Sequence, residues 1–87
     1  MTAPRPLEVI LYTRPGCHLC EDAKLVITPL LHEFHGILRE VNIDDDPRLT
    51  ALYGVDIPVI FIGSRKVAKH RVDPRQFRRQ LEEASAK

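Results

Sequence analysis

The feature that most constrains the fold is a short β-forming run followed, across a Pro-Gly breaker, by a long amphipathic pattern. Residues 7–12 are rich in β-forming side chains and end shortly before Pro15-Gly16, which predicts a buried strand. Beyond the breaker, apolar residues recur at the i, i+3, i+4 spacing of a helix. This stripe predicts a helix from about Cys17 to His35, with Gly36 as its C′ residue. Pro29 removes one hydrogen bond inside it, and because the stripe continues beyond, we expect a kink.

The rest of the chain predicts three more strands, over 37–43, 57–62 and 66–70, and two more helices. An aspartate precedes a proline at each helix start, in Asp46-Pro47 and Asp73-Pro74, as an N-cap precedes an N1 proline. The order is βαβαββα. A helix joins the first two strands, which should be parallel, and a tight turn joins the last two, which must be antiparallel. We therefore predict an α/β fold with one mixed four-stranded sheet flanked by helices.

Length and charge narrow the classes of function. A chain of 87 residues predicts a single domain over 1–87, ordered over about 7–83. A net charge of only +1 indicates neither a nucleic acid nor a membrane as partner. No apolar run reaches the length of a membrane span, and the first six residues do not resemble a secretory signal. We expect a cytoplasmic monomer.

The two cysteines, Cys17 and Cys20, stand where the first helix should begin. A bridge between them closes a loop too short to restrict the unfolded chain much, so stapling explains them poorly. At a helix N-terminus, unpaired N–H groups and the positive end of the dipole stabilise a thiolate on Cys17. Cys17 would attack a disulfide, and Cys20, one turn further in, would resolve the mixed disulfide. His18 would tune the thiolate when protonated.

Two segments of the chain carry a family resemblance. The run Tyr-Thr-Arg-Pro-Gly-Cys-His-Leu-Cys over 12–20 and the run Asp-Ile-Pro-Val-Ile-Phe-Ile-Gly over 56–63 resemble the glutaredoxins and glutaredoxin-like proteins of the thioredoxin superfamily. The resemblance implies a thioredoxin-like fold and a thiol–disulfide oxidoreductase, with Cys17 as nucleophile and Cys20 as resolving thiol. It also implies a cis Pro58 across from the pair, and an Ile57 backbone free to bind a peptide or glutathione.

The same resemblance places Arg14 where a cation binds a glutathione carboxylate. Tyr12, which ends the first strand, would either contact substrate or pack there. Two departures leave the reductant open between glutathione and a reductase of the thioredoxin-reductase type. The stretch 67–73 lacks the family's Gly-Gly pair, and His-Leu replaces the usual Pro-Tyr between the cysteines. We expect a disulfide-bearing protein or glutathione as substrate and no tightly bound cofactor.

The alternative is a metal-binding carrier that uses the same cysteines for zinc or an iron–sulfur cluster. With His32 and His35 they even approach a zinc-finger spacing. His32 lies about 18 Å of helix beyond Cys20, however, so one continuous helix cannot close a tetrahedral site. Basic residues also gather in the last third of the chain. They fit either a solvated edge strand and helix face or a surface for an acidic partner.

Overall fold

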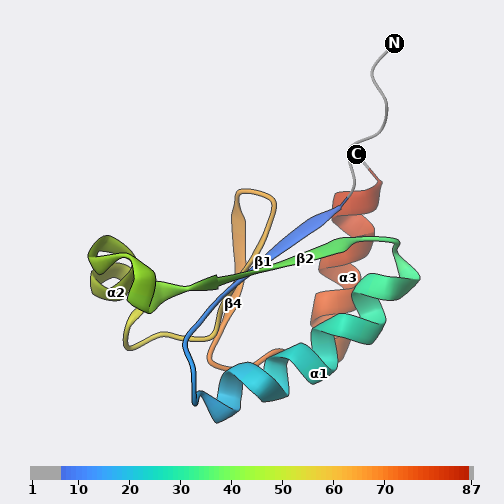
Figure 1. The fold of residues 1–87 in the computed structure, drawn as a ribbon. Helices are drawn as coiled ribbons and strands as arrows, with labels where there is room; N and C mark the ends of the chain where they lie inside the picture. Colours follow the sequence, from blue (N-terminus) through green and yellow to red (C-terminus); the bar gives the residue numbers. More distant parts are fainter. Residues whose placement is uncertain (1–6, 87) are drawn as a thin grey trace.

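The computed structural model describes residues 7–86, which form one four-stranded sheet with helices against it (Figure 1). The strands are β1 (Glu8–Thr13), β2 (Ile37–Asn42), β3 (Val59–Ile62) and β4 (Arg65–Lys69), and the helices are α1 (His18–Glu33), η1 (Ile43–Asp45, a 3₁₀ turn), α2 (Pro47–Tyr53) and α3 (Pro74–Ser85). The strand order is β2-β1-β3-β4; β1 and β2 are parallel, whereas the other two pairs are antiparallel. The predicted α/β class, order and sheet are confirmed.

The hydrophobic core lies between one face of the sheet and the two long helices. Val9 and Leu11 of β1 stand opposite Ile62 and Ile60 of β3, so strand alternation turns all four toward the same face. The apolar stripe of α1 and the buried Phe77 of α3 pack on them. Figure 1 shows α1 and α3 side by side on this face. This core holds the end of β1 and the start of α1, where the cysteines lie.

The opposite face of the sheet carries a cluster of three aromatic rings. Tyr12 of β1 lies 4.7 Å from Tyr53 of α2 and 5.6 Å from Phe61 of β3, measured between ring centroids. The contact between Tyr12 and Phe61 is edge-on, a favoured arrangement of aromatic pairs. The short helix α2 is thereby packed against one end of this face (Figure 1).

The C-terminus of α1 differs from the prediction. His35, and not Gly36, takes the left-handed conformation at C′, with φ 55°. The amide of Gly36 donates to Leu31 O at 2.9 Å and that of His35 to His32 O at 3.1 Å, the two bonds of a Schellman motif. Gly36 is needed for space instead, because a Cβ there would lie 2.9 Å from the carbonyl oxygen of Leu7.

The predicted element boundaries are otherwise off by one or two residues. Helix α1 begins at His18 with Cys17 as N-cap, and it continues through Pro29 without a break. β2 ends at Asn42 because Ile43 already starts the 3₁₀ turn. β3 begins at Val59, after the proline that cannot donate to the ladder. Within residues 7–86, no helix combines the length and the apolar character needed to cross a membrane.

Candidate functional site

The cysteine pair lies where β1 gives way to α1. Gly16 adopts φ +79°, a conformation that suits glycine, and the turn it completes delivers Cys17 to the N-cap in extended geometry (φ −91°, ψ 107°). The Cys17 sulfur accepts a hydrogen bond from the backbone N–H of Cys20 at 3.1 Å. A sulfur therefore occupies the N-cap place that an oxygen of Ser, Thr or Asp fills in most helices.

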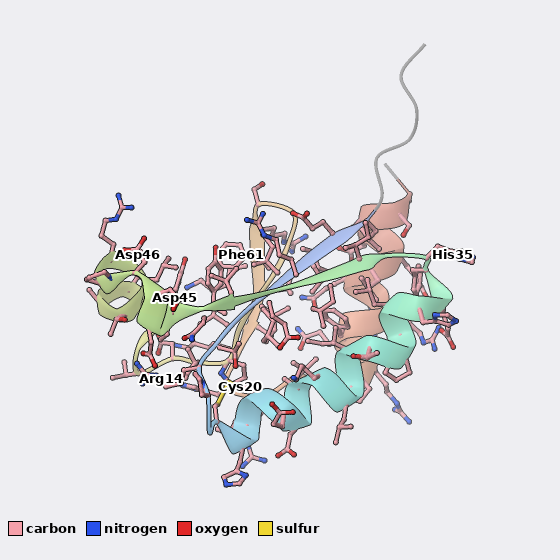
Figure 2. The ribbon with its side chains drawn as sticks, in the orientation of Figure 1. Arg14, Cys20, His35, Asp45, Asp46 and Phe61 are labelled. Carbon is pink, nitrogen blue, oxygen red and sulfur yellow. A yellow bond between two sulfur atoms is a disulfide. The ribbon has the colours of Figure 1, made fainter. Side chains whose placement is uncertain are left out.

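The two sulfurs are within bonding distance and form a disulfide, with the two Cα atoms 5.2 Å apart. Their surroundings differ: Cys20 is completely buried, whereas Cys17 is partly exposed. Figure 2 shows Cys20 in the first turn of α1. The structure thus brings the two predicted residues together and leaves Cys17 more exposed to solvent than Cys20.

The charges on the first turns of α1 are partly neutralised. His18 is exposed, as expected for a residue between the cysteines. Glu21, whose carboxylate would oppose a nearby thiolate, forms an ion pair with Lys24 at 3.3 Å. Lys24 also pairs with Glu40 of β2 at 3.2 Å, and the hydrogen bonds that it donates to Glu40 and then to Glu21 raise the pKa of Lys24 above its ordinary value. Glu21 therefore places less net negative charge beside the cysteines than the sequence suggests.

The Ile57-Pro58 segment lies at the same edge of the sheet as the cysteines. Tyr12 stands opposite Val59 in the antiparallel pair of β1 and β3, so the next residue back, Pro58, falls opposite Thr13, close to the turn that leads to Cys17. The bond between Ile57 and Pro58 is cis, and Pro58 is fully buried. This agrees with what the family resemblance implies.

The backbone of Ile57 is less available than predicted. Its N–H donates to the carbonyl oxygen of Tyr53 at 3.1 Å, so the expectation of a free Ile57 backbone is wrong for the donor. The reason is the turn that follows α2, in which the N–H groups of Asp56 and Ile57 both point back to that carbonyl. The carbonyl oxygen of Ile57 accepts no hydrogen bond from another residue within 7–86, and that it accepts one from a substrate stays a prediction.

Arg14 is already paired. Its Nε and Nη2 donate to the same oxygen of Asp44 at 3.1 and 2.9 Å. The parallel register of β1 and β2, which sets Thr13 opposite Asn42, brings the two loops together. No local pattern in the sequence indicates this pairing, because the two residues stand 30 positions apart.

Tyr12 belongs to the aromatic cluster with Tyr53 and Phe61, which gives its half-buried ring a packing role. A contact between Tyr12 and substrate stays a prediction. The ring joins the end of β1 to α2, and so it helps to place the turn that carries Arg14.

Sequence reasoning missed His70 as a residue of this site. Its N–H donates to Pro58 O at 2.8 Å, and its ring Nε2 lies 3.1 Å from Val55 O. Asp56, in the same loop, lies 3.7 Å from that ring nitrogen. His70 also adopts positive φ, 67°, a conformation that His tolerates better than most residues. Nothing in the local pattern marks it, because it stands in a run of cations after β4.

A shallow groove of about 180 Å³ runs between the start of α1 and the segment after β4. Leu19 and Ala23 line one side, and His70, Arg71 and Val72 line the other. Leu19 stands between the two cysteines in the chain, so the groove begins next to the cysteine pair and leads away from it.

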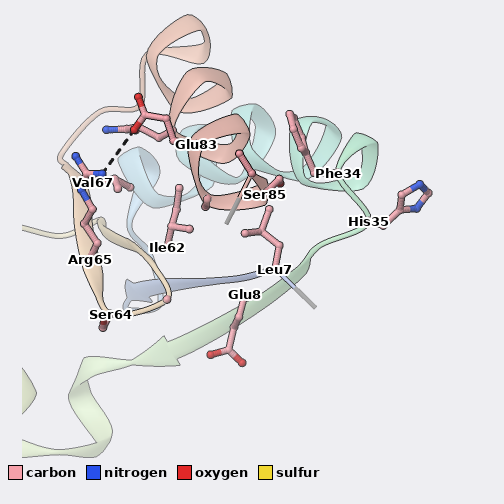
Figure 3. Close-up of a pocket in the computed structure, with 14 residues that line it drawn as sticks. Leu7, Glu8, Phe34, His35, Ile62, Ser64, Arg65, Val67, Glu83 and Ser85 are labelled. Atoms are coloured by element: carbon pink, nitrogen blue, oxygen red, sulfur yellow. Dashed lines mark ion pairs between the residues drawn. The ribbon is translucent and has the colours of Figure 1, made fainter. Parts of the chain in front are cut away.

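A larger pocket lies at the opposite end of the sheet (Figure 3). Its walls include Leu7, which directly precedes β1, together with Phe34 and Val67, and an ion pair of 3.7 Å joins Arg65 to Glu83 at its rim. It contains neither cysteine nor any other predicted site residue. The pocket lies at one end of β1 and the cysteine pair follows its other end, so the length of a strand separates them.

The structure does not bring the histidines of α1 to the cysteines. Figure 2 shows Cys20 at one end of the helix and His35 beyond the other. Within residues 7–86, no three side chains of His, Cys, Asp or Glu lie close enough together to hold a metal ion. The zinc-finger spacing of the cysteines with His32 and His35 has no counterpart in space.

Comparison with known proteins agrees with this arrangement. The family model of the Glutaredoxin-like domain (DUF836) matches residues 8–82, which include both cysteines and the cis-proline. The chain belongs to the glutaredoxin-like family. This glutaredoxin-like protein is 31% identical over 84 residues to the Glutaredoxin-like protein YDR286C homolog of Dictyostelium discoideum, a match that covers 90% of the chain and 78% of the relative.

Two solved structures place the glutaredoxin-like protein among thioredoxin folds. It resembles the X-ray structure of protein XcR50 from X. campestris, with a TM-score of 0.73 and 29% identity over 86% of this chain and 96% of that one. It also resembles a mutant thioredoxin from Halobacterium salinarum, with a TM-score of 0.65 and 18% identity over 91% of this chain and 74% of that one. The second likeness shows the shared fold, and the predicted thioredoxin-like architecture is confirmed.

Proposed function

We propose that this glutaredoxin-like protein is a dithiol–disulfide oxidoreductase that reduces mixed disulfides of proteins or of glutathione. One observation carries the proposal: the sulfur of Cys17, a partly exposed residue, caps α1 and accepts the N–H of Cys20, a fully buried residue whose own sulfur is within bonding distance. A nucleophile must be reached by substrate, and a resolving thiol must reach only the nucleophile. The different burial of the two cysteines meets both conditions.

The helix start supplies the electrostatic support for catalysis. The N–H group that donates to Cys17 is one of those left without a partner in the first turn of α1, and it lies at the positive end of the helix dipole. Both favour the thiolate of Cys17, which is the form that attacks a disulfide. Pairing of Glu21 with Lys24 reduces the opposing negative charge, and a protonated His18 would add a cation.

The reaction transfers two electrons in two exchanges. The Cys17 thiolate attacks one sulfur of the substrate disulfide, forms a bond to it and expels the other substrate sulfur as a thiolate, which takes a proton from solvent. The Cys20 thiol then loses its proton to solvent and its sulfur attacks that of Cys17, which forms the internal disulfide and releases the second substrate thiolate, and this thiolate takes a proton from solvent. The substrate disulfide is reduced to two thiols, and the protein ends in the oxidised state that the structure shows.

A dithiol or two monothiols must reduce the protein again. We propose glutathione or a reductase of the thioredoxin-reductase type as this electron donor, in the cytoplasm, where thiols are kept reduced. Substrate backbone would pair with the free carbonyl oxygen of Ile57 and lie in the groove beside Leu19.

The experiment compares the wild type with Cys17→Ser and Cys20→Ser. Each pre-reduced protein is mixed with a peptide carried as a glutathione mixed disulfide, with dithiothreitol as the bulk reductant. We expect Cys17→Ser to lose turnover completely. Cys20→Ser, mixed with the same peptide in the absence of dithiothreitol, should accumulate a covalent adduct of Cys17 with glutathione or the peptide, visible by mass spectrometry, because neither a second thiol of the protein nor an added reductant resolves it. Turnover that survives Cys17→Ser would refute the assignment.

The metal content of the purified protein separates this function from the carrier. Zinc or an iron–sulfur cluster at one equivalent, lost in both serine variants and accompanied by no reductase activity, would establish the carrier and overturn the oxidoreductase. We expect no stoichiometric metal in active wild-type protein.

A further inference from the structure

The ion pair between Arg14 and Asp44 lies beside the cysteine pair and has no part in the exchange chemistry itself. Arg14 precedes Cys17 by three residues, so its backbone is within about 10 Å of the nucleophile. The Nε and Nη2 groups form one edge of the guanidinium, and both point at a single oxygen of Asp44. This edge is one that a substrate carboxylate would need for a two-pronged contact.

Asp44 is held in place through a hydrogen bond of its backbone N–H. The side-chain oxygen of Asn42, the last residue of β2, accepts the N–H of Asp44 at 2.9 Å and fixes the start of the 3₁₀ turn. Because β2 runs parallel to β1 in register, the carboxylate is presented to Arg14 by the sheet itself. The pair stays accessible, with 33% of the Arg14 and 49% of the Asp44 side chain exposed to solvent.

The local charge next to Arg14 is therefore not positive. Asp44 neutralises the guanidinium, and the neighbouring Asp45 is exposed and forms no ion pair within residues 7–86. A small thiol that carries carboxylates, such as glutathione, must displace Asp44 to use the Nε–Nη2 edge of Arg14, and it must also approach Asp45. A disulfide partner without charge meets neither obstacle.

We propose that Asp44 is a positioning residue that sets substrate choice through Arg14. It withholds the guanidinium from carboxylate-bearing small disulfides and favours disulfides whose partner near Cys17 is uncharged. This inference rests on the proposed oxidoreductase function and names the substrate class of the same site.

The test measures selectivity and not rate alone. One cysteine peptide is prepared as a mixed disulfide with glutathione and, separately, with 2-mercaptoethanol, which has no charge. Single-turnover reduction by pre-reduced protein gives a second-order rate constant for each, and their ratio is the readout. A general change in Cys17 reactivity affects both substrates alike and cancels in this ratio.

The variants are Asp44→Asn, Asp45→Asn as the matched control, and Asp44→Asn combined with Arg14→Gln. An exposed ion pair is worth up to about 1 kcal/mol, so we expect Asp44→Asn to raise the ratio of glutathione to mercaptoethanol rates about three- to fivefold. Asp45→Asn, which removes the same charge one residue away, should change the ratio by less than half as much. The double variant should return to the wild-type ratio, because the gain needs the freed guanidinium.

Equal changes of the rate ratio in Asp44→Asn and Asp45→Asn would mean that only the net charge of the region matters, and this would overturn the proposal. A gain that persists without Arg14, or an unchanged ratio in a folded Asp44→Asn protein, would do the same. Asp44→Ser serves as a second variant if the first does not fold. Failure of the wild type to reduce either mixed disulfide would instead refute the oxidoreductase function.

Discussion

The left-handed residue at the end of α1 offers a quantitative test of the structure. His35 has φ 55°, it is exposed, and its side chain makes no hydrogen bond or ion pair with another residue within 7–86. The change His35→Gly therefore acts on the backbone almost alone. His32, one turn earlier in the same helix and also exposed, has the ordinary helical conformation. His32→Gly is the same chemical change in a different backbone setting.

The two changes should have opposite signs. A non-glycine residue in the left-handed region costs about 1–2 kcal/mol, and His tolerates it better than most, so glycine relieves about 1 kcal/mol at position 35. Glycine also increases the conformational entropy of the unfolded chain, which lowers the free energy of unfolding by about 0.5 kcal/mol. His35→Gly should therefore stabilise the protein by about 0.5 kcal/mol. His32→Gly should destabilise it by about 0.4 kcal/mol, the difference in helix propensity.

Urea denaturation of the oxidised protein, followed by far-ultraviolet circular dichroism, measures both variants against the wild type. The two should differ by about 1 kcal/mol in the free energy of unfolding, which corresponds to about 4–8 °C in melting temperature for a domain of this size. Similar slopes with denaturant would show that compactness is unchanged. Destabilisation by both changes would mean that His35 is not in the left-handed region, and the reasoning would fail.

Three further predictions concern stability, pH and the site. Phe77→Ala should cost about 3–5 kcal/mol, because the ring is 1% exposed in the core, and thermal unfolding would detect it. A hydrogen bond from Arg48 lowers the pKa of Asp46 below its ordinary value of 3.8. The stability that this carboxylate contributes is present above pH 3.8 and is lost as the pH falls through the lower pKa of the folded state. Asp46→Asn keeps the cap but cannot titrate, so its free energy of unfolding should fall less steeply with acid than that of the wild type. His70→Asn keeps the left-handed conformation but shortens the reach to Val55 O, and it should speed hydrogen exchange in the loop before Pro58; unchanged exchange would contradict the contact.

Local signals in the chain predicted most of the fold. The i, i+3, i+4 stripe after Cys17 predicts a helix wherever it lies, because only that period turns its apolar side chains to one face. Asp46-Pro47 and Asp73-Pro74 predict helix starts because capping depends on two or three consecutive residues, and both begin as predicted. The parallel and antiparallel pairings follow from the length of the connections.

Part of the candidate site could also be read from the chain. Cys17 and Cys20 are three positions apart at a helix start, so the local backbone alone brings their sulfurs together. Gly36 shows the limit of such reasoning. A glycine after a helix predicts the left-handed C′ position, yet here it answers a steric demand set by the carbonyl of Leu7, at the far end of the preceding strand.

The antiparallel pairing of β1 with β3 joins residues far apart in the chain, and the sequence did not predict it. The amino-acid sequence by itself determined the elements, their order, the relative directions of β1 and β2 and of β3 and β4, and the cysteine pair at a helix start, because each depends on a local pattern or on the length of one connection. Only the tertiary structure decided what surrounds that pair. Asp44 on Arg14, His70 against the loop before Pro58, and the Ile57 N–H bonded to Tyr53 all depend on sheet register or on how a turn folds back. These contacts join segments whose local patterns carry no information about one another, and so they appear only once the strands are paired and the core is packed.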